Sequence, residues 1–286
     1  MKKFALIGSA GYIAERHMKA IKENGGNLVA CLDKVDRMGH IDKYFPEAEM
    51  YFDEGRFFDS LFNPVSPENK VDYIVICSPN HTHQYFIITA INKGFDVICE
   101  KPITTNTYDI NQIDSYNKRR QKNIYSILQL RIHPEILKIK EKYKDKKADI
   151  KLIYNTPRGK WYHQSWKGKV DKSGGLAMNI GVHFFDMLIW IFGSVLDIEI
   201  IGYSYDYISG ILKLERANIE WSLSISMKNK TKRELIINGE TIDFTNGFTN
   251  LHTKYYSMIL SGDAYKIDDA VESIKLCEQI KYLING

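Results

Sequence analysis

The chain has 286 residues, of which 44% are hydrophobic and 26% charged, and its net charge is +4. This length favours two domains, and the composition is that of a globular protein rather than a disordered or fibrous one. The charge is mild and no recognition module is present, so no nucleic-acid role is expected. No apolar run approaches the roughly 20 residues of a membrane span, and no signal peptide is expected. The four cysteines lie far apart without zinc-site spacing, which predicts buried free thiols in a reducing cytoplasm.

Strands and helices alternate over the first 130 residues. The apolar runs predict strands at 3–8, 28–32, 71–77, 96–99 and 124–130. Helical patterns lie between them at 12–24, 82–93 and 106–120. This alternation predicts an α/β fold with a right-handed, mostly parallel, doubly wound sheet of the Rossmann type. We place this first domain at residues 1–130.

The pattern changes near residue 130. Longer strand-like stretches, in which polar and apolar residues alternate, follow at 149–155, 195–207, 211–214, 219–226 and 234–237. Helices are expected at 133–143, 175–192 and 268–283. Alternation of this kind predicts a mostly antiparallel open sheet with one wet face. Residues 131–286 are therefore expected to form a second, α+β domain.

A glycine-rich turn follows the first strand. The sequence Gly8-Ser9-Ala10-Gly11-Tyr12-Ile13-Ala14 stands where a G-x-G-x-x-G/A fingerprint belongs, with Ala10 at the second glycine position. Such a turn lets the backbone approach a pyrophosphate at a helix N-terminus. Asp33 ends the second strand, where a carboxylate binds ribose hydroxyls and repels a 2′-phosphate; Asp36 is a second candidate for this role. The pattern predicts NAD, bound by Gly8, Ala10, Gly11, Tyr12, Ile13 and Asp33.

Polar residues also follow the strand at 71–77. Ser78, Asn80 and His83 lie at its carboxyl end, where open α/β sheets bind ligands, and are expected near the nicotinamide ribose. His81 and His83 invite a metal interpretation, but nothing nearby completes a ligand set. We therefore expect no metal site.

The tripeptide Glu100-Lys101-Pro102 ends the strand at 96–99. A carboxylate at Glu100 is suited to hold ribose hydroxyls, so Glu100 and Lys101 join the expected cofactor contacts. Lys101 would also place a cation beside the reacting carbon. The competing interpretation is a surface lysine followed by a turn.

Taken with Gly174-Gly175, with residues 179–183 (Asn-Ile-Gly-Val-His) and with Asp186, these motifs resemble the Gfo/Idh/MocA oxidoreductase family over essentially the whole chain. The resemblance implies that the first domain binds NAD(P) and that the second shapes a sugar site and an oligomer interface. Asn179 departs from the family pattern, because many members have aspartate there.

Several stretches resemble one branch of this family, the dehydrogenases that oxidise UDP-N-acetylglucosaminuronate (UDP-GlcNAcA) at the sugar 3-hydroxyl. These stretches are 8–14, 129–134, 158–162, 165–168, 172–175 and 179–188. The branch supplies a 3-keto sugar nucleotide to an aminotransferase in lipopolysaccharide and O-antigen synthesis. The resemblance implies a homotetramer or homodimer, with a 2-oxo acid as a candidate final hydride acceptor. It also implies cofactor contacts from Gln129 and Trp166.

The charges of the second domain agree with an anionic nucleotide sugar. Between residues 158 and 172, cations alternate with aromatic rings, a combination suited to such a ligand. The competing interpretation is a solvated basic loop. The expected substrate contacts are Lys101, Arg131, Arg158, Tyr162, Lys167, Asn179 and His183.

Oxidation of a secondary alcohol requires a base, and neutral imidazole suits that role near neutrality. We expect His183 to be the base and Lys101 to stabilise the developing alkoxide, although these two roles could be exchanged. The competing interpretation of His183 is a core histidine. Two other functions stay open at this point, namely a dehydrogenase of another sugar or inositol and a non-catalytic NAD-binding regulator.

Overall fold

The computed structural model describes residues 1–62, 70–242 and 250–285. It divides into two compact units. The first comprises Met1–Ile103, Tyr108–Ile127 and Asn250–Asp268, and the second comprises Thr104–Thr107, Leu128–Thr249 and Asp269–Gly286. The predicted division at residue 130 did not include the return of residues 250–268 to the first unit.

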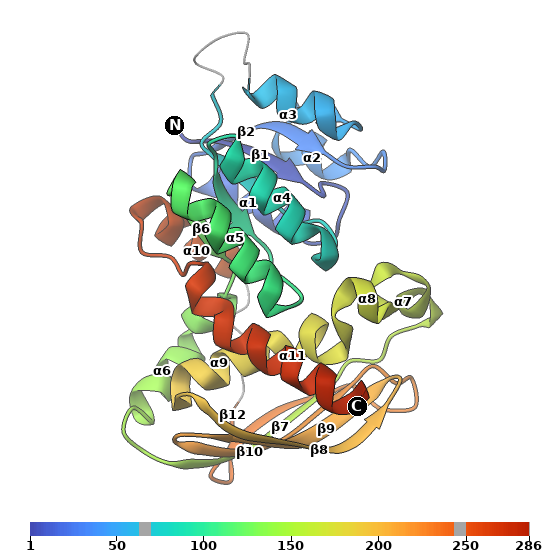
Figure 1. The fold of residues 1–286 in the computed structure, drawn as a ribbon, viewed down its shortest axis with the longest axis vertical. Helices are drawn as coiled ribbons and strands as arrows, with labels where there is room; N and C mark the ends of the chain where they lie inside the picture. Colours follow the sequence, from blue (N-terminus) through green and yellow to red (C-terminus); the bar gives the residue numbers. More distant parts are fainter. Residues whose placement is uncertain (63–69, 243–249, 286) are drawn as a thin grey trace. The chain divides into compact units, whose positions relative to one another are not determined.

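The first unit is built on six parallel strands in the order β3-β2-β1-β4-β5-β6 (Figure 1). Their bounds are β1 Lys3–Ile7, β2 Asn27–Leu32, β3 Glu49–Tyr51, β4 Tyr73–Ile76, β5 Asp96–Cys99 and β6 Ile124–Ser126. The order reverses between β1 and β4, so the carboxyl ends of these two strands form the topological switch point at which such sheets bind ligands. The predicted α/β, doubly wound class is confirmed.

The helices of the first unit are α1 Ala14–Glu23, α2 Gly39–Tyr44, α3 Glu54–Phe62, α4 His83–Asn92, α5 Thr107–Arg120 and α10 Leu251–Ser261. Helix α1 packs against α10, which the sequence analysis did not predict. The side chain of Asn24 donates to the carbonyl of Thr253, and the Thr253 hydroxyl donates to Glu23. These bonds fix a late segment of the chain to the first helix.

Strand β6 is shorter than the predicted 124–130. The amide of Ser126 donates to the carbonyl of Tyr265, and the amide of Ile127 donates to Cys99. The chain then turns into a 3₁₀ segment, Gln129–Ile132. Strand β6 therefore ends close to Ile127, where the chain passes from the first unit to the second.

The second unit contains a six-stranded sheet in the order β12-β11-β7-β10-β9-β8, in which only the β7–β10 pair is parallel among the described strands. The strands are β7 Ala148–Asn155, β8 Val195–Ser204, β9 Tyr207–Leu214, β10 Ala217–Ser224, β11 Lys232–Ile237 and β12 Glu240–Ile242. In β10, Ala217, Ile219, Trp221 and Leu223 are buried while Asn218 and Glu220 are exposed. This alternation confirms the mostly antiparallel, one-sided sheet.

Helices cover one face of this sheet (Figure 1). They are α6 Pro134–Lys142, α9 Val182–Phe192 and α11 Val271–Asn285. Two shorter helices, α7 Lys160–Gln164 and α8 Val170–Ser173, lie to one side of this layer. A π-helical segment, Ala177–Gly181, leads directly into α9. Gly181 permits close packing there, because a Cβ atom on it would lie 2.7 Å from Phe185 and 2.8 Å from Leu223 of β10.

One stretch of the described residues is long and apolar enough to cross a membrane by length and composition alone. It comprises the 23 residues Val170–Phe192, contrary to the expectation that no apolar run approaches this length. The buried share of its most apolar window is 61%, and a core helix of a globular domain passes the same test. The core helix α9 accounts for most of this signal.

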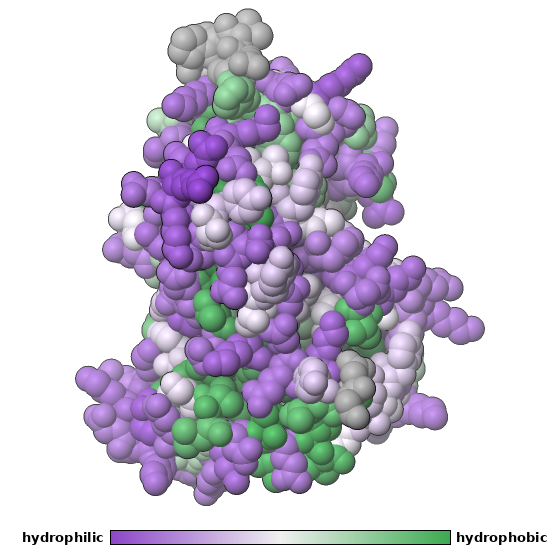
Figure 2. All heavy atoms as spheres, viewed as in Figure 1, coloured by the Kyte–Doolittle hydropathy of each residue, from purple (hydrophilic) through white to green (hydrophobic). Residues whose placement is uncertain are grey.

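The edge strand β8 exposes large apolar side chains, including Leu196 at 67% and Ile201 at 61%. Figure 2 shows apolar side chains gathered over the second unit, in the lower part of the view. All four cysteines are buried free thiols, as predicted.

We expect a side chain at Gly8 to destabilise the fold more than one at Gly94, a glycine with a similar φ in open space. Gly8 has φ +88°, and a Cβ atom there would lie 2.7 Å from backbone atoms of Cys77 and Ser78. Gly94 has φ +90° with open space around it. Gly94→Ala should therefore cost about 1–2 kcal/mol from the left-handed conformation alone, whereas Gly8→Ala should add roughly 1–3 kcal/mol of overpacking. Urea unfolding of both variants measures the difference, and equal losses would contradict the close contact.

Candidate active site

The turn after β1 forms a compact cradle at the switch point. The amide of Gly8 donates to the carbonyl of Leu32 at 2.8 Å, and that of Gly11 donates to Gly8 at 3.1 Å. Among the described residues, the amides of Tyr12 and Ile13 donate no hydrogen bond, and no side chain caps α1. Helix N-termini with free amides bind phosphate groups. The turn therefore fits the pyrophosphate of a dinucleotide.

Asp33 joins this turn to the end of β2. Its Oδ2 accepts the amide of Ala10 at 2.9 Å, and its Oδ1 accepts the amide of Val35 at 3.0 Å. Each carboxylate oxygen has further acceptor capacity, so ribose hydroxyls can still bind here. The alanine in the second glycine position thus contributes through its amide.

The segment after β4 is tied to the Glu100-Lys101-Pro102 segment by His83. Its two ring nitrogens lie 2.8 Å from the carbonyl oxygens of Ser78 and Pro102. Burial lowers the pKa of His83, so the ring is neutral and donates to one carbonyl at a time. The Ser78 hydroxyl bonds to Thr82 at 2.7 Å, and Asn80 is buried. His83 therefore holds this loop against the Glu100-Lys101-Pro102 segment, and its contact with the cofactor stays a prediction.

Glu100 is buried, at 7% exposure, and its expected contact with a ribose stays a prediction. Its Oε1 is 2.9 Å from His17 Nε2 and 3.1 Å from His252 Nε2, and its Oε2 accepts the amide of Lys101 at 3.2 Å. The other nitrogen of His17 lies 2.8 Å from the Tyr256 hydroxyl. Lys101 itself is partly exposed.

Sequence reasoning missed His17, His252 and Tyr256. The available signal was His17, which shares a helical face with Ala14, Met18 and Ile21, all of them buried. A polar side chain on such a face requires a buried partner. His252 and Tyr256 belong to helix α10, which was not predicted, so the sequence could not show that they are the partners of His17 and Glu100.

In the second unit, two of the predicted substrate contacts, Asn179 and Tyr162, lie next to each other. Asn179 Nδ2 donates to the Tyr162 hydroxyl at 2.8 Å. Asn179 lies in the π-helical segment, and such segments occur frequently at functional sites. Burial raises the pKa of Tyr162, so its hydroxyl stays protonated.

Two cations meet nearby, Arg158 and Lys167. Lys167 Nζ lies 5.7 Å from the ring centres of Trp161 and Trp166. Burial, followed by the charge of Arg158, lowers the pKa of Lys167. The buried Nε of Arg158 has no hydrogen-bond partner among the described residues. Two close cations with aromatic walls form a surface suited to an anion.

A hollow in the second unit adjoins these residues. It lies between the α7–α8 region, the β8–β9 turn and the end of α11, and its lining includes Tyr162, Lys167, Gly174, Gly175, Tyr203 and Tyr205. Gly174 and Gly175 both have positive φ, which allows the sharp turn into the π-helical segment. The predicted glycine pair therefore shapes one wall of the hollow.

His183 is partly exposed on α9, whereas Val182 and Phe184 on either side of it are buried. This exposure disfavours the core-histidine interpretation. His183, Gln129 and Trp166 belong to the second unit, whereas Lys101 and the nucleotide turn belong to the first. The pairing of Lys101 with His183, like the cofactor contacts of Gln129 and Trp166, stays a prediction.

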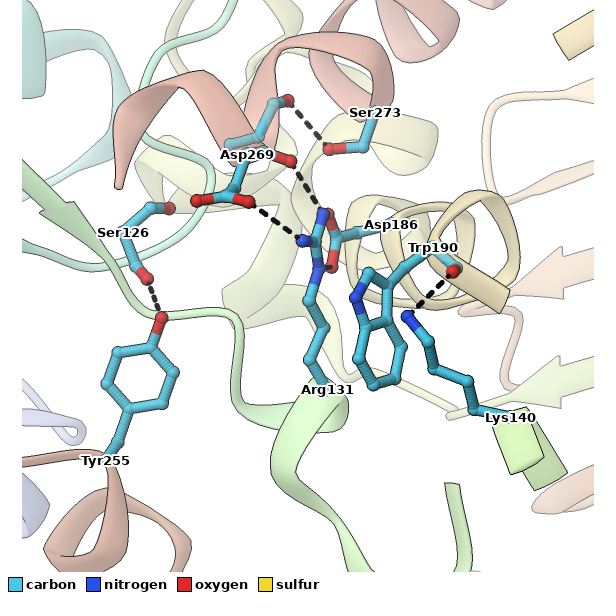
Figure 3. A network of polar contacts seen from close by, with 9 residues as sticks. Ser126, Arg131, Lys140, Asp186, Trp190, Tyr255, Asp269 and Ser273 are labelled. Carbon is cyan, nitrogen blue, oxygen red and sulfur yellow. Dashed lines mark hydrogen bonds and ion pairs between the residues drawn. The ribbon is translucent and has the colours of Figure 1, made fainter. Parts of the chain in front are cut away.

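Arg131 has other partners than the expected anion (Figure 3). Its Nε and Nη2 donate to the two carboxylate oxygens of Asp186 at 2.9 and 2.8 Å, and Nη2 also donates to the carbonyl of Asp269 at 2.6 Å. Lys140 Nζ lies 3.4 Å from the centre of the Trp190 ring beside this network. Arg131 is buried and ties α9 to the 3₁₀ segments on either side, so the structure shows a structural role for it. Its contact with a substrate stays a prediction.

Comparison with known proteins agrees with this architecture. The model of the NAD-binding Rossmann fold of the Gfo/Idh/MocA oxidoreductase family matches residues 2–127, and that of its C-terminal alpha/beta domain matches residues 146–200. A WlbA (WbpB) dehydrogenase from Thermus thermophilus, solved with NAD and alpha-ketoglutarate, is 40% identical, with a TM-score of 0.94, over 99% of this chain and 96% of that chain. The chain belongs to the Gfo/Idh/MocA oxidoreductase family.

A second structure of this enzyme and a more distant relative are also similar to the chain. The same Thermus thermophilus dehydrogenase in complex with NAD and UDP-GlcNAcA is 40% identical, with a TM-score of 0.93, over 98% of this chain and 95% of that one. The inositol 2-dehydrogenase of Rhizobium meliloti is 24% identical over 194 residues, which are 67% of this chain and 55% of that protein. The chain spans about half or less of the length of the curated relatives it matches first.

The Arg131–Asp186 pair supports a stability prediction. Burial raises the pKa of Asp186, and the bonds from Arg131 offset only part of that effect. Arg131→Met should leave the buried Asp186 carboxylate unpaired and lower the free energy of unfolding by about 3–5 kcal/mol. The double variant Arg131→Met/Asp186→Leu should recover most of this loss. As a control, Lys142→Met in the exposed pair with Glu240 should cost less than about 1 kcal/mol. Chemical unfolding tests this, and no recovery in the double variant would contradict it.

Proposed function

We propose that this family member is an NAD-dependent dehydrogenase that oxidises the 3-hydroxyl of UDP-GlcNAcA to a 3-keto sugar nucleotide. The likeness to the Thermus thermophilus enzyme solved with NAD and UDP-GlcNAcA, at 40% identity over 98% of the chain, carries the proposal. The product suits an aminotransferase of lipopolysaccharide or O-antigen synthesis. The compact domains and their buried free thiols support a cytoplasmic enzyme.

NAD would be held by the turn at Gly8, Ala10 and Gly11, the free amides of Tyr12 and Ile13 and the carboxylate of Asp33. Ser78 and Asn80 follow β4 at the same carboxyl edge, and Gln129 and Trp166 complete the proposed contacts. When bound, NAD supplies the hydride acceptor. The carboxylate of Asp33 would repel a 2′-phosphate, which favours NAD over NADP.

The anionic groups of the substrate would bind cationic side chains of the second unit. A UDP-hexuronate carries a diphosphate and a carboxylate, and Arg158 and Lys167 provide two cations beside aromatic rings. Asn179 and Tyr162, joined at 2.8 Å, present an amide and a hydroxyl to the sugar. Arg131 contributes by holding α9, which carries His183.

His183 would accept the proton of the 3-hydroxyl, and the ammonium of Lys101 would stabilise the negative charge that develops on that oxygen. The partial exposure of both side chains supports their availability to a ligand.

The hydride would finally pass to a 2-oxo acid, since the Thermus thermophilus enzyme was solved with NAD and alpha-ketoglutarate. The exposed apolar residues of β8 support a homo-oligomer, a tetramer or a dimer. A second candidate is inositol oxidation, which the likeness to the Rhizobium meliloti enzyme favours.

The first test follows NADH absorbance in purified protein with NAD and UDP-GlcNAcA, with and without 2-oxoglutarate, alongside detection of the 3-keto sugar. Turnover with UDP-GlcNAcA and inhibition by UDP are expected. Turnover of myo-inositol without inhibition by UDP would favour the second candidate, and binding of NAD with no turnover of either substrate would favour a regulator.

We expect His183→Asn to lower kcat about 10²–10⁴-fold, because the general base is lost. Lys101→Met should lower kcat about 10²–10³-fold, because an oxyanion donor is lost. Steady-state kinetics with both substrates varied measures these effects, and His40→Asn, at another partly exposed histidine, provides the control. Full turnover in His183→Asn would contradict its assignment as the base.

We expect Arg158→Leu and Lys167→Leu each to raise the KM for UDP-GlcNAcA about tenfold, because a charge-assisted contact with the substrate is lost. The Kd for NAD should stay unchanged, as measured by titration of intrinsic fluorescence. Lys169→Leu, at an exposed lysine of the same segment, should leave both constants unchanged. An equal rise in KM for all three variants would indicate a diffuse charge effect instead of a defined anion site.

A further inference from the structure

Next to Lys101 in the first unit, four buried polar side chains are hydrogen-bonded to one another. His17 from α1 and His252 from α10 both direct Nε2 at Glu100 Oε1, at 2.9 and 3.1 Å, while Tyr256 bonds to His17 Nδ1 at 2.8 Å. We call these four residues, Glu100, His17, His252 and Tyr256, the Glu100 cluster. All four are buried.

The protonation states of the cluster follow from its environment. Burial lowers the pKa of His17, so its ring is neutral and has one N–H. Burial also acts to raise the pKa of Glu100, but the hydrogen bonds from His17 and His252 outweigh it and hold that pKa well below its usual value. For a neutral His17, the arrangement that pairs a donor with an acceptor at both ring nitrogens has Nε2–H donating to the carboxylate and Tyr256 O–H donating to Nδ1.

The carboxylate is joined to Lys101 through the backbone. Glu100 Oε2 accepts the amide of Lys101 at 3.2 Å, so the donors on Oε1 hold the carboxylate in the orientation that this bond requires. Loss of one donor would leave a buried anion underpaired, which is costly, and the carboxylate would turn away from the Lys101 amide.

We propose that His17, His252 and Tyr256 are positioning residues that fix the backbone of Lys101 through Glu100. The inference rests on the proposed function only in assigning Lys101 to the reaction. Helix α10 accordingly contributes to the positioning of Lys101, because it supplies His252 and Tyr256 to the cluster.

Two pairs of variants separate positioning from general support of the fold. Tyr255 and Tyr256 are neighbours in α10, both are fully buried, and each forms a buried hydroxyl bond, but Tyr255 bonds to the carbonyl of Ser126 instead of to the cluster. Tyr256→Phe and Tyr255→Phe therefore remove equivalent groups. His252→Leu removes the N–H donor to Glu100, whereas His252→Gln can restore one.

The direct readout is hydrogen exchange at the Lys101 amide. The sequence contains two Glu–Lys pairs, Glu100-Lys101 and Glu141-Lys142. Labelling glutamate with ¹³C at the carbonyl and lysine with ¹⁵N therefore selects two amides, and that of Lys142 is the internal control. We expect His252→Leu to accelerate exchange at Lys101 about tenfold and to lower kcat about tenfold with little change in KM. Tyr256→Phe should act in the same direction, and His252→Gln should stay within about threefold of wild type for both quantities.

Three results would overturn the proposal. Equal loss of kcat in Tyr255→Phe and Tyr256→Phe would show that α10 only supports the fold. Unchanged exchange at Lys101 in His252→Leu would show that Glu100 does not transmit the effect. One equivalent of metal in wild-type protein, absent from His252→Leu by elemental analysis, would show that this donor set binds an ion. If wild type fails to oxidise UDP-GlcNAcA, the proposed function fails, and amide exchange still decides the positioning.

Discussion

The close approach of Gly8 to the backbone of Cys77 and Ser78 is the contact on which the first unit depends. A Cβ atom at Gly8 would lie 2.7 Å from these atoms, so any larger residue would push the turn after β1 away from the end of β4. This contact leaves the amides of α1 free at the carboxyl edge. The same edge receives the ends of β2 and β5, and so it collects Asp33 and Lys101 from distant parts of the sequence. The cofactor site is a consequence of strand order.

In the second unit, the helix that must be held in place is α9, which carries both the buried Asp186 and the partly exposed His183. Arg131 binds Asp186 through two hydrogen bonds at 2.9 and 2.8 Å, and this fixes α9 one turn beyond His183. A buried pair of this kind adds little net stability but makes other arrangements costly. Lys101 is held in a comparable way by the buried carboxylate of Glu100. In both units, an ionised group in the interior fixes the backbone next to a partly exposed residue.

The sequence allowed prediction of what is local. The strand ends at Gly8, Asp33, Ser78 and Glu100 could be found because each follows an apolar run, and the order of strands and helices predicted the sheet. Helix α10 could not be found, because its face is defined by partners such as His17, 239 residues from Tyr256. Arg131 was expected at an anion because its partner Asp186, 55 residues away, becomes adjacent only in the folded unit. Polar residues at strand ends look alike in sequence, whether they turn inward as Glu100 does or stay partly exposed as Lys101 does.

The departure from the family pattern at Asn179 has a physical reading. An amide at this position donates to the Tyr162 hydroxyl at 2.8 Å, so the hydroxyl proton of Tyr162 is free to point toward another acceptor. An aspartate would instead accept that proton and would place a negative charge beside Tyr162, whose hydroxyl is within reach of the charge of Arg158. For a neutral sugar that charge costs little, but for a hexuronate or a diphosphate it would oppose binding. Asparagine at 179 therefore keeps the donor toward Tyr162 and, under the proposed function, leaves the charge of Arg158 for an anionic substrate.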